Sequence, residues 1–317
     1  MPAQTTLSYR EGVRPVNVGL LFDRYFRFGA GWKLGEVNRE SIKKLNCRGL
    51  IRHLRANADD PDWRELSESH RCRWEAAAVA NGATVFSMQP EWRFVVGVGR
   101  KTALEAGLTF NRPWGFPVVP GSALKGLARS VALRELAAEL GVIEGNRGDF
   151  LQKLQEWLEA GLHPADGERP QEPRAEECLP GPASLRTELS LHLQTVNRFR
   201  RVFGTTRAAG QAVFFDAIPR GLPCLEMDIV NVHHPGYYQS EPGHRQPPAD
   251  WEDPVPSFFL TVGSDTAYLF AVGWRSPQDS DGPDQEQAVS WLRQGLTAHG
   301  IGAKTAAGYG YFVPGGS

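Results

Sequence analysis

Near its C-terminal end the chain reads Gly300-Ile301-Gly302-Ala303-Lys304-Thr305-Ala306-Ala307-Gly308-Tyr309-Gly310-Tyr311-Phe312. A helical pattern leads into this segment and a strand pattern leads out of it, so it is predicted to join a core helix to a core strand. Glycine accepts positive φ and has no Cβ, which lets backbone N–H groups approach a phosphate closely. The segment therefore allows two interpretations. It is either a flexible connection or a phosphate-binding loop, whose members would be Gly302, Lys304, Thr305 and Gly308.

A second glycine-containing segment reads Pro120-Gly121-Ser122-Ala123-Leu124-Lys125-Gly126-Leu127-Ala128-Arg129. Ser122 is predicted to be the N-cap of a helix that continues to about Leu140, and the free N–H groups of a helix start attract anions. Lys125 and Arg129 are one turn apart and share a helix face. We therefore expect Gly121, Ser122, Lys125 and Arg129 to form a phosphate seat. The Walker A pattern is absent, so the sequence does not support nucleotide hydrolysis.

The composition is that of a globular protein without a membrane segment. Of the 317 residues, 41% are hydrophobic and 22% are charged, which is ordinary for a soluble protein. No apolar run reaches the roughly 18 residues needed to cross a bilayer, and residues 1–14 lack the apolar core of a secretory signal. The four cysteines are widely spaced, as expected for reduced thiols. We expect a cytoplasmic protein with no membrane partner.

Charge is unevenly distributed along the chain, although its net value is −1. Residues 1–101 contain 17 Lys and Arg against 11 Asp and Glu, whereas residues 241–290 contain 2 against 9. The neutral total argues against a generally basic nucleic-acid binder. The asymmetry has two interpretations. One face attracts phosphate while another repels it or meets a basic partner, or both regions are ordinary solvated surface.

Periodicity and capping signals predict an alternation of helices and strands. Helices are expected at residues 37–56, 62–80, 122–140, 149–160 and 285–298, and another begins near residue 184. Strands are expected at residues 91–101, 107–110, 210–217, 225–230, 257–262, 267–273 and 309–313. The strands at 257–262 and 267–273 are predicted to form a hairpin. Prolines and mixed charge indicate surface loops at 163–184 and 231–256.

The predicted order of elements is typical of an α+β, ferredoxin-like (RRM-like) core with large helical and loop insertions. We assign this core to residues 86–317, and we expect residues 1–85 to form an arm and a helical segment packed on it. The two glycine segments then take equivalent places in the core. One precedes the first core helix and the other follows the last.

Several motifs occur in the order seen in the RAMP superfamily of CRISPR-associated proteins, which this chain resembles over about residues 90–314. They are Gly97-Val98-Gly99, the segment from Pro120 to Gly126, Phe203-Gly204 with the run from Gly210 to Pro219, and the terminal glycine loop. The run from Met227 to Tyr238, with Asp228, His233, His234, Tyr237 and Tyr238, resembles the branch that supplies the sixth subunit of type III-B (Cmr) effector complexes. Ala123 departs from the pattern, because the family often has a second serine there.

The resemblance implies a subunit without catalytic residues, cofactor or metal. It would cap the filament of backbone subunits near the 3′ part of the guide RNA and serve antiviral RNA interference. Its partners would be guide RNA, target RNA and other type III-B subunits, namely backbone RAMP subunits, a small helical subunit and a further capping RAMP subunit. Together with the basic residues of the chain, it predicts RNA contacts from Gly121, Ser122, Lys125, Arg129, Arg100, Lys101, Arg201, Arg207, His233, His234, Gly302, Lys304, Thr305 and Gly308.

Other functions stay open on the sequence. The first is a metal-independent RAMP endoribonuclease that processes repeat RNA, with His233 and His234 as general acid and base. The second is a RAMP subunit of another type III complex. Tyr237 and Tyr238 either stack on bases or anchor a loop. Cys224, His233, His234 and His244 have no recognised metal-site spacing.

Overall fold

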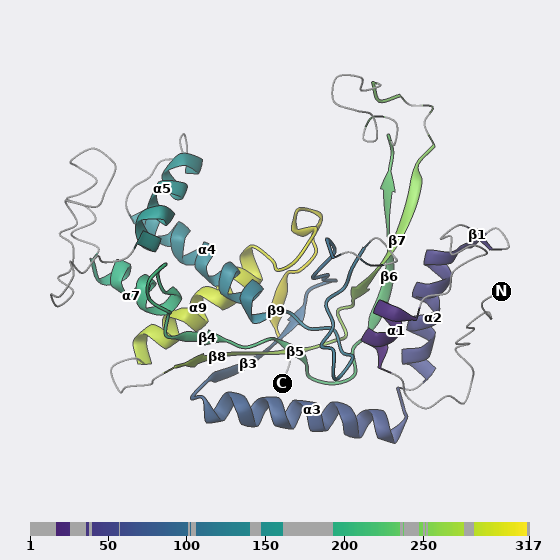
Figure 1. Ribbon diagram of the computed structural model, residues 1–317, viewed down its shortest axis with the longest axis horizontal. Coiled ribbons are helices and arrows are strands. Elements are labelled where there is room, and N and C mark those ends of the chain that lie inside the picture. The colour runs from purple at the N-terminus through teal and green to yellow at the C-terminus, as the bar shows by residue number, and fades with distance from the viewer. Residues whose placement is uncertain are drawn as a thin grey trace.

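A five-stranded antiparallel sheet forms the centre of the computed structural model (Figure 1). Its strands are β3 (Thr84–Pro90), β4 (Ala212–Phe214), β5 (Ile218–Pro219), β8 (Tyr268–Trp274) and β9 (Phe312–Pro314). The order is β4-β8-β3-β9, and β5 also pairs with β8. When the two-residue strand β5 is left aside, β3, β4, β8 and β9 are the first to fourth strands along the chain. They lie in the order second, third, first and fourth, as in the split βαβ order of a ferredoxin-like fold. The predicted fold class is confirmed.

The structure describes residues 17–25, 36–37, 40–56, 58–100, 102, 106–139, 147–160, 193–234, 237, 247–249, 251, 253–275 and 282–315. The predicted loop at 163–184 lies outside these residues. Within them, no helix combines the length and the apolar character that crossing a bilayer requires.

Helices cover both faces of the sheet (Figure 1). On one face α4 (Gly121–Glu139) packs against α9 (Gly282–Ala298), and α3 (Pro61–Ala80) lies along the other. A Cβ on Gly295 of α9 would lie 2.7 Å from Cγ of Leu127, so this glycine lets the two helices approach closely. The helices run in opposite directions, and therefore α4 begins at the end of the layer where α9 stops.

The core lies mainly between the sheet and α4 with α9. Every residue of β8 is buried, as expected for a strand covered on both faces. On the α9 side the rings of Phe86 and Phe270 stack at 5.5 Å. A smaller cluster of Val118, Ile218 and Leu269, with Trp74 of α3, lies apart from the main core. Two further helices, α5 (Arg147–Ala160) and α7 (Leu193–Phe203), pack against α4.

Two long strands, β6 (Leu225–Val232) and β7 (Val255–Val262), form a ribbon that projects from the core (Figure 1). Helix α2 (Ile42–Ala56) packs against this ribbon and against α1 (Val18–Arg24). A short pair, β1 (Glu36–Val37) with β2 (Glu40–Ser41), precedes α2. The division of the chain near residue 85 stays a prediction.

The predicted hairpin of residues 257–262 and 267–273 is wrong. β7 pairs with β6, whereas β8 pairs with β3, β4 and β5 in the other sheet. The turn between β7 and β8 is held against Cys224, whose N–H donates to the Thr266 hydroxyl at 2.7 Å and whose carbonyl accepts from Gly263 N–H at 2.9 Å. These contacts direct the chain from one sheet into the other.

Three other predicted elements also change. The first core strand is β3, which ends at Pro90, and residues 91–100 are irregular except for a bridge between Phe94 and Val262. Their apolar character reflects burial of residues 94–96. Residues 107–110 contribute only a bridge from Phe110 to Pro117. The predicted loop at 231–256 is shorter, because β6 continues to Val232 and β7 begins at Val255.

Candidate nucleic-acid interface

The glycine-rich loop, residues 300–311, is fastened to the chain that follows β3. The N–H of Ala303 donates to the carbonyl oxygen of Val95 at 2.9 Å, and that of Gly310 donates to Arg93 at 2.8 Å. Glu91 N–H donates in return to Tyr311 at 2.9 Å. A short 3-10 helix, η4 (Thr305–Ala307), forms the tip. These hydrogen bonds hold the loop in one conformation, so it is not a flexible connection.

The glycines of this loop have different roles. Gly302 and Gly310 have positive φ, and a Cβ on either would overlap a backbone carbonyl oxygen, of Val95 and of Ile301 respectively. These two glycines permit close packing. Gly308 also has positive φ, yet it has open space around it. Lys304, with φ 63°, is the one non-glycine residue of positive φ in the described ranges, a conformation that costs about 1 kcal/mol or more.

Lys304 presents the loop's positive charge. Its amine lies 5.1 Å from the ring centre of Phe259 and 6.0 Å from that of Tyr309. It forms no ion pair with any residue that the structure describes. Within the same residues, the backbone N–H groups of Gly302, Lys304, Thr305 and Ala306 make no hydrogen bond to another backbone group. The loop thus offers a cation and several donors to an anion such as a phosphate.

Asp228 of β6 ties the ribbon to the glycine-rich loop. Its carboxylate accepts hydrogen bonds from the Tyr309 hydroxyl and from Arg93 Nη1, the latter at 2.6 Å, and Arg93 also pairs with Glu226. Burial acts to raise the pKa of Asp228, but the hydrogen bonds from Tyr309, Ile229 N–H and Arg93 outweigh it and hold the pKa below its usual value. Burial and the bond to Asp228 raise the pKa of Tyr309 to about 12. Sequence reasoning noted Asp228 only as part of a motif.

The start of α4 differs from the predicted phosphate seat. The helix begins at Gly121, and the carbonyl of Pro120 accepts from Ala123 and Leu124 N–H, so Ser122 lies in the first turn and is not the N-cap. The N–H of Gly121 donates to the carboxylate of Asp216 at 2.7 Å. Asp216 therefore already supplies an anion to this helix start.

The two basic residues of α4, Lys125 and Arg129, have different surroundings. Arg129 forms an ion pair with Glu159 of α5 and lies 5.6 Å from the ring centre of Phe199. Lys125 is half-buried, and burial lowers its pKa, as do the positive charges of Arg275 and Arg129. Lys125 has no acidic partner among the described residues. Lys125 and Arg275 therefore form a small positive surface. The sequence analysis predicted an RNA contact at Lys125 but not at Arg275.

The other residues predicted to contact RNA lie in separate parts of the structure. Arg201 pairs with the buried Asp284, Arg100 lies 3.9 Å from Asp23, and Arg207 is exposed. Lys101 lies outside the described residues. His233 is exposed and His234 half-buried, directly after the end of β6. The structure thus brings Lys125 and Arg129 together and gathers the loop residues, but it puts the histidines at the far end of the ribbon (Figure 1).

Cys224 does not lie close enough to His233 and His234 to share a metal ion with them. Cys224 lies just before β6 and His233 just after it, so the length of the strand, about 25 Å, separates them. Tyr237 is half-buried, while His244 and Tyr238 lie outside the described residues. In the described part of the chain, no three His, Cys, Asp or Glu side chains form a group that could hold a metal.

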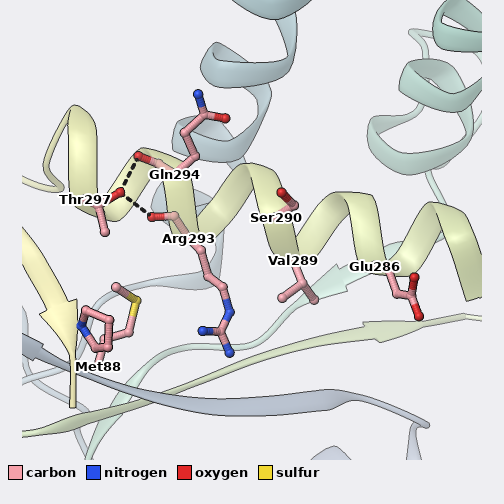
Figure 2. A pocket seen from close by; sticks show the side chains of 8 residues that line it. Met88, Glu286, Val289, Ser290, Arg293, Gln294 and Thr297 are labelled. Atoms are coloured by element: carbon pink, nitrogen blue, oxygen red, sulfur yellow. Dashed lines mark hydrogen bonds between the residues drawn. The ribbon is translucent and has the colours of Figure 1, made fainter. Parts of the chain in front are cut away.

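An open groove lies between α9 and the edge of the sheet (Figure 2). It is lined by Met88, Glu286, Val289, Ser290, Arg293, Gln294, Thr297 and Pro314. The guanidinium of Arg293 lies 4.2 Å from the ring centre of Phe86. None of the predicted RNA-contacting residues lines this groove.

Comparison with known proteins gives several matches. The family model of the RAMP superfamily matches residues 93–313. Over 233 residues the chain is 36% identical to the CRISPR system Cmr subunit Cmr6 of Pyrococcus furiosus, and the match covers 70% of this chain and 65% of that protein. The chain therefore spans slightly less than two thirds of this curated relative.

Two solved structures are also similar. The crystal structure of Cmr6 from Pyrococcus furiosus matches with a TM-score of 0.45 and 32% identity, covering 74% of this chain and 98% of that one. The cryo-EM structure of the type III-B Cmr-beta bound to cognate target RNA matches with a TM-score of 0.49 and 16% identity, covering 85% of this chain and 70% of that one.

Proposed function

This chain belongs to the RAMP superfamily, and from that premise we propose that it is an RNA-binding structural subunit of a type III-B CRISPR (Cmr) ribonucleoprotein. It has no catalytic role in this proposal. The observation that carries the proposal is the 36% identity to a Cmr6 subunit over 233 residues. The resemblance of the run around Asp228, His233 and His234 to the same branch supports it.

RNA binding in this proposal depends on phosphate contacts. The glycine-rich loop offers the amine of Lys304, which has no ion pair within the described residues, and backbone N–H groups that make no backbone hydrogen bond there. Helix α4 offers Lys125 beside Arg275. Such contacts position a nucleic acid without reading its sequence. Guide–target base pairing would supply the specificity, as in other RNA-guided effectors.

The finer placement follows from the family resemblance. The subunit caps the filament of backbone RAMP subunits near the 3′ part of the guide RNA, and its partners are those subunits, the small helical subunit and a further capping RAMP subunit. Because the net charge is only −1, we expect weak RNA binding by the isolated chain. Binding becomes much tighter in the assembly, where several sites act together.

The experiment is a tagged purification from the native host, followed by sequencing of the bound RNA and identification of the bound proteins. The proposal expects short spacer-bearing RNAs together with the other CRISPR subunits. A matched Lys304→Ala strain is expected to recover the same proteins with less RNA. Recovery of the chain alone, or with uncleaved repeat transcripts, would contradict the proposal. Cleavage of repeat RNA in EDTA that His233→Ala abolishes would support the endoribonuclease instead.

A further inference from the structure

We propose that Trp92 forms a base-stacking subsite beside the glycine-rich loop, which takes one unpaired nucleobase of single-stranded RNA. The inference rests on the proposed RNA-binding function and adds to it a contact that phosphate binding does not require. Trp92 was predicted only as part of a buried strand. In the structure this residue is instead 46% exposed.

The Trp92 ring is exposed yet held in place. Its centroid lies 4.9 Å from that of Tyr309 with an interplanar angle of 55°, and the Arg93 guanidinium carbon lies 5.0 Å from the Trp92 ring centre. The backbone is fixed on both sides, because Glu91 N–H donates to Tyr311 and Arg93 accepts from Gly310. A ring fixed before binding loses little conformational entropy when a ligand stacks on it.

The supporting residues are themselves fixed by polar contacts. Tyr309 is buried and donates its hydroxyl proton to Asp228, while Arg93 pairs with both Asp228 and Glu226. The Arg93 guanidinium beside the Trp92 ring is therefore held by two carboxylates, and this group has one more anion than cations. These contacts fix the two residues that touch the ring, while Trp92 itself stays exposed.

The cation of the glycine-rich loop favours RNA over an apolar protein partner. Lys304 Nζ lies 6.0 Å from the centre of the Tyr309 ring, which is the ring that supports Trp92. An exposed aromatic ring beside a cation and free backbone donors is the combination that binds single-stranded nucleic acid, in which the ring stacks on a base and the cation meets the backbone. Such a site binds any nucleobase whose face is accessible, and it does not distinguish between RNA sequences.

Two labelled single strands with equal numbers of phosphates separate stacking from phosphate binding. One is a short oligoadenosine, and the other is an abasic ribose-phosphate strand of the same length. For the purified chain, we expect fluorescence anisotropy to give tighter binding of the oligoadenosine. Trp92→Ala should reduce affinity for the oligoadenosine by about 5- to 150-fold. Affinity for the abasic strand, and the salt dependence of binding, should stay unchanged.

Two variants serve as controls. Trp92→Phe keeps a ring at the position and should retain part of the preference for the base-bearing strand. Trp251 is 87% exposed, so Trp251→Ala tests whether removal of any exposed tryptophan has the same effect, and we expect no change. Melting temperatures establish that each variant is folded.

The outcomes distinguish this inference from the proposed function. Salt-dependent binding of both strands with equal affinity would overturn the stacking subsite and leave phosphate binding intact. Binding of neither strand, alone or in the assembled complex, would overturn RNA binding and the subsite with it. If Trp92→Ala binds oligoadenosine as the wild type does but loses a co-purifying subunit, Trp92 contacts protein, and the inference is wrong.

Discussion

The backbone N–H of Gly121 donates a 2.7 Å hydrogen bond to the carboxylate of Asp216. A protein anion therefore occupies the first donor of α4, the position where the sequence alone predicted an RNA phosphate. Of the two basic residues in the predicted phosphate site, Arg129 pairs with Glu159, whereas Lys125 has no acidic partner among the described residues. Contacts to RNA at this helix are thus expected from the Lys125 side chain more than from the helix terminus.

Gly121 and Gly126, both on α4, should respond oppositely to substitution by alanine. A Cβ on Gly121 would overlap the carbonyl oxygen of Phe214, whereas a Cβ on Gly126 would meet no atom within 4 Å. Gly121→Ala is expected to destabilise the protein by about 1–3 kcal/mol. Gly126→Ala should stabilise it by about 0.5–1 kcal/mol. Urea unfolding checks both, and equal midpoints for the two variants would refute the packing described at Gly121.

Asp284→Asn should destabilise the junction of α7 and α9. The Asp284 side chain is only 4% exposed and accepts from Arg198 Nε at 2.8 Å and from Arg201 Nη2. Asparagine keeps the size but loses the charge, so the expected cost is about 1–3 kcal/mol. The measurement is the free energy of unfolding in urea. Asp59→Asn is the matched control, because the Asp59–Arg64 pair is exposed, and it should leave stability unchanged.

Acid should weaken the attachment of the glycine-rich loop. The pKa of Asp228 is lowered in the folded state, so its ionised form contributes stability above the unfolded pKa of about 4. That contribution is lost as pH falls through the lower, folded pKa. Wild-type stability should therefore decrease below about pH 4 more steeply than that of Asp228→Asn. Melting temperature measured against pH tests this.

Tyr309→Phe is the matched variant for the acid experiment. It keeps the ring that contacts Trp92 but removes the hydroxyl that donates to Asp228. The pKa of Asp228 should move up toward its usual value, and the acid-dependent loss should become smaller. Identical pH profiles for the wild type, Asp228→Asn and Tyr309→Phe would show that this network does not stabilise the fold.

Local patterns were sufficient to predict the core helices and the ferredoxin-like order of strands. The periodicity of residues 62–80 and 285–298 is a property of each segment, and the structure has α3 and α9 at nearly those bounds. Glycine in the terminal loop was also interpreted correctly as permitting positive φ and close approach.

Pairing between distant segments could not be predicted in the same way. The turn at 263–266 has the composition of a hairpin, but the contacts of Gly263 and Thr266 with Cys224 redirect the chain. Similarly, no local signal shows that Asp216 reaches Gly121 or that Asp228 reaches Tyr309. Trp92 was predicted to lie in a buried strand because an apolar run follows it. In the structure that run is buried against the glycine-rich loop, whereas Trp92 is exposed.

The central claim is that Lys125 and Lys304 hold RNA by its phosphates. The most direct measurement is the affinity for labelled single-stranded RNA, determined by filter binding at several salt concentrations. The slope of log affinity against log salt should fall in magnitude by about 1.4 in Lys125→Ala/Lys304→Ala, at about 0.7 per lost contact, and affinity should fall equally for unrelated sequences. Arg64→Ala, which removes an exposed base on α3 that pairs with Asp59, should leave the slope unchanged. An unchanged slope in the double variant, or a loss confined to one RNA sequence, would contradict the account.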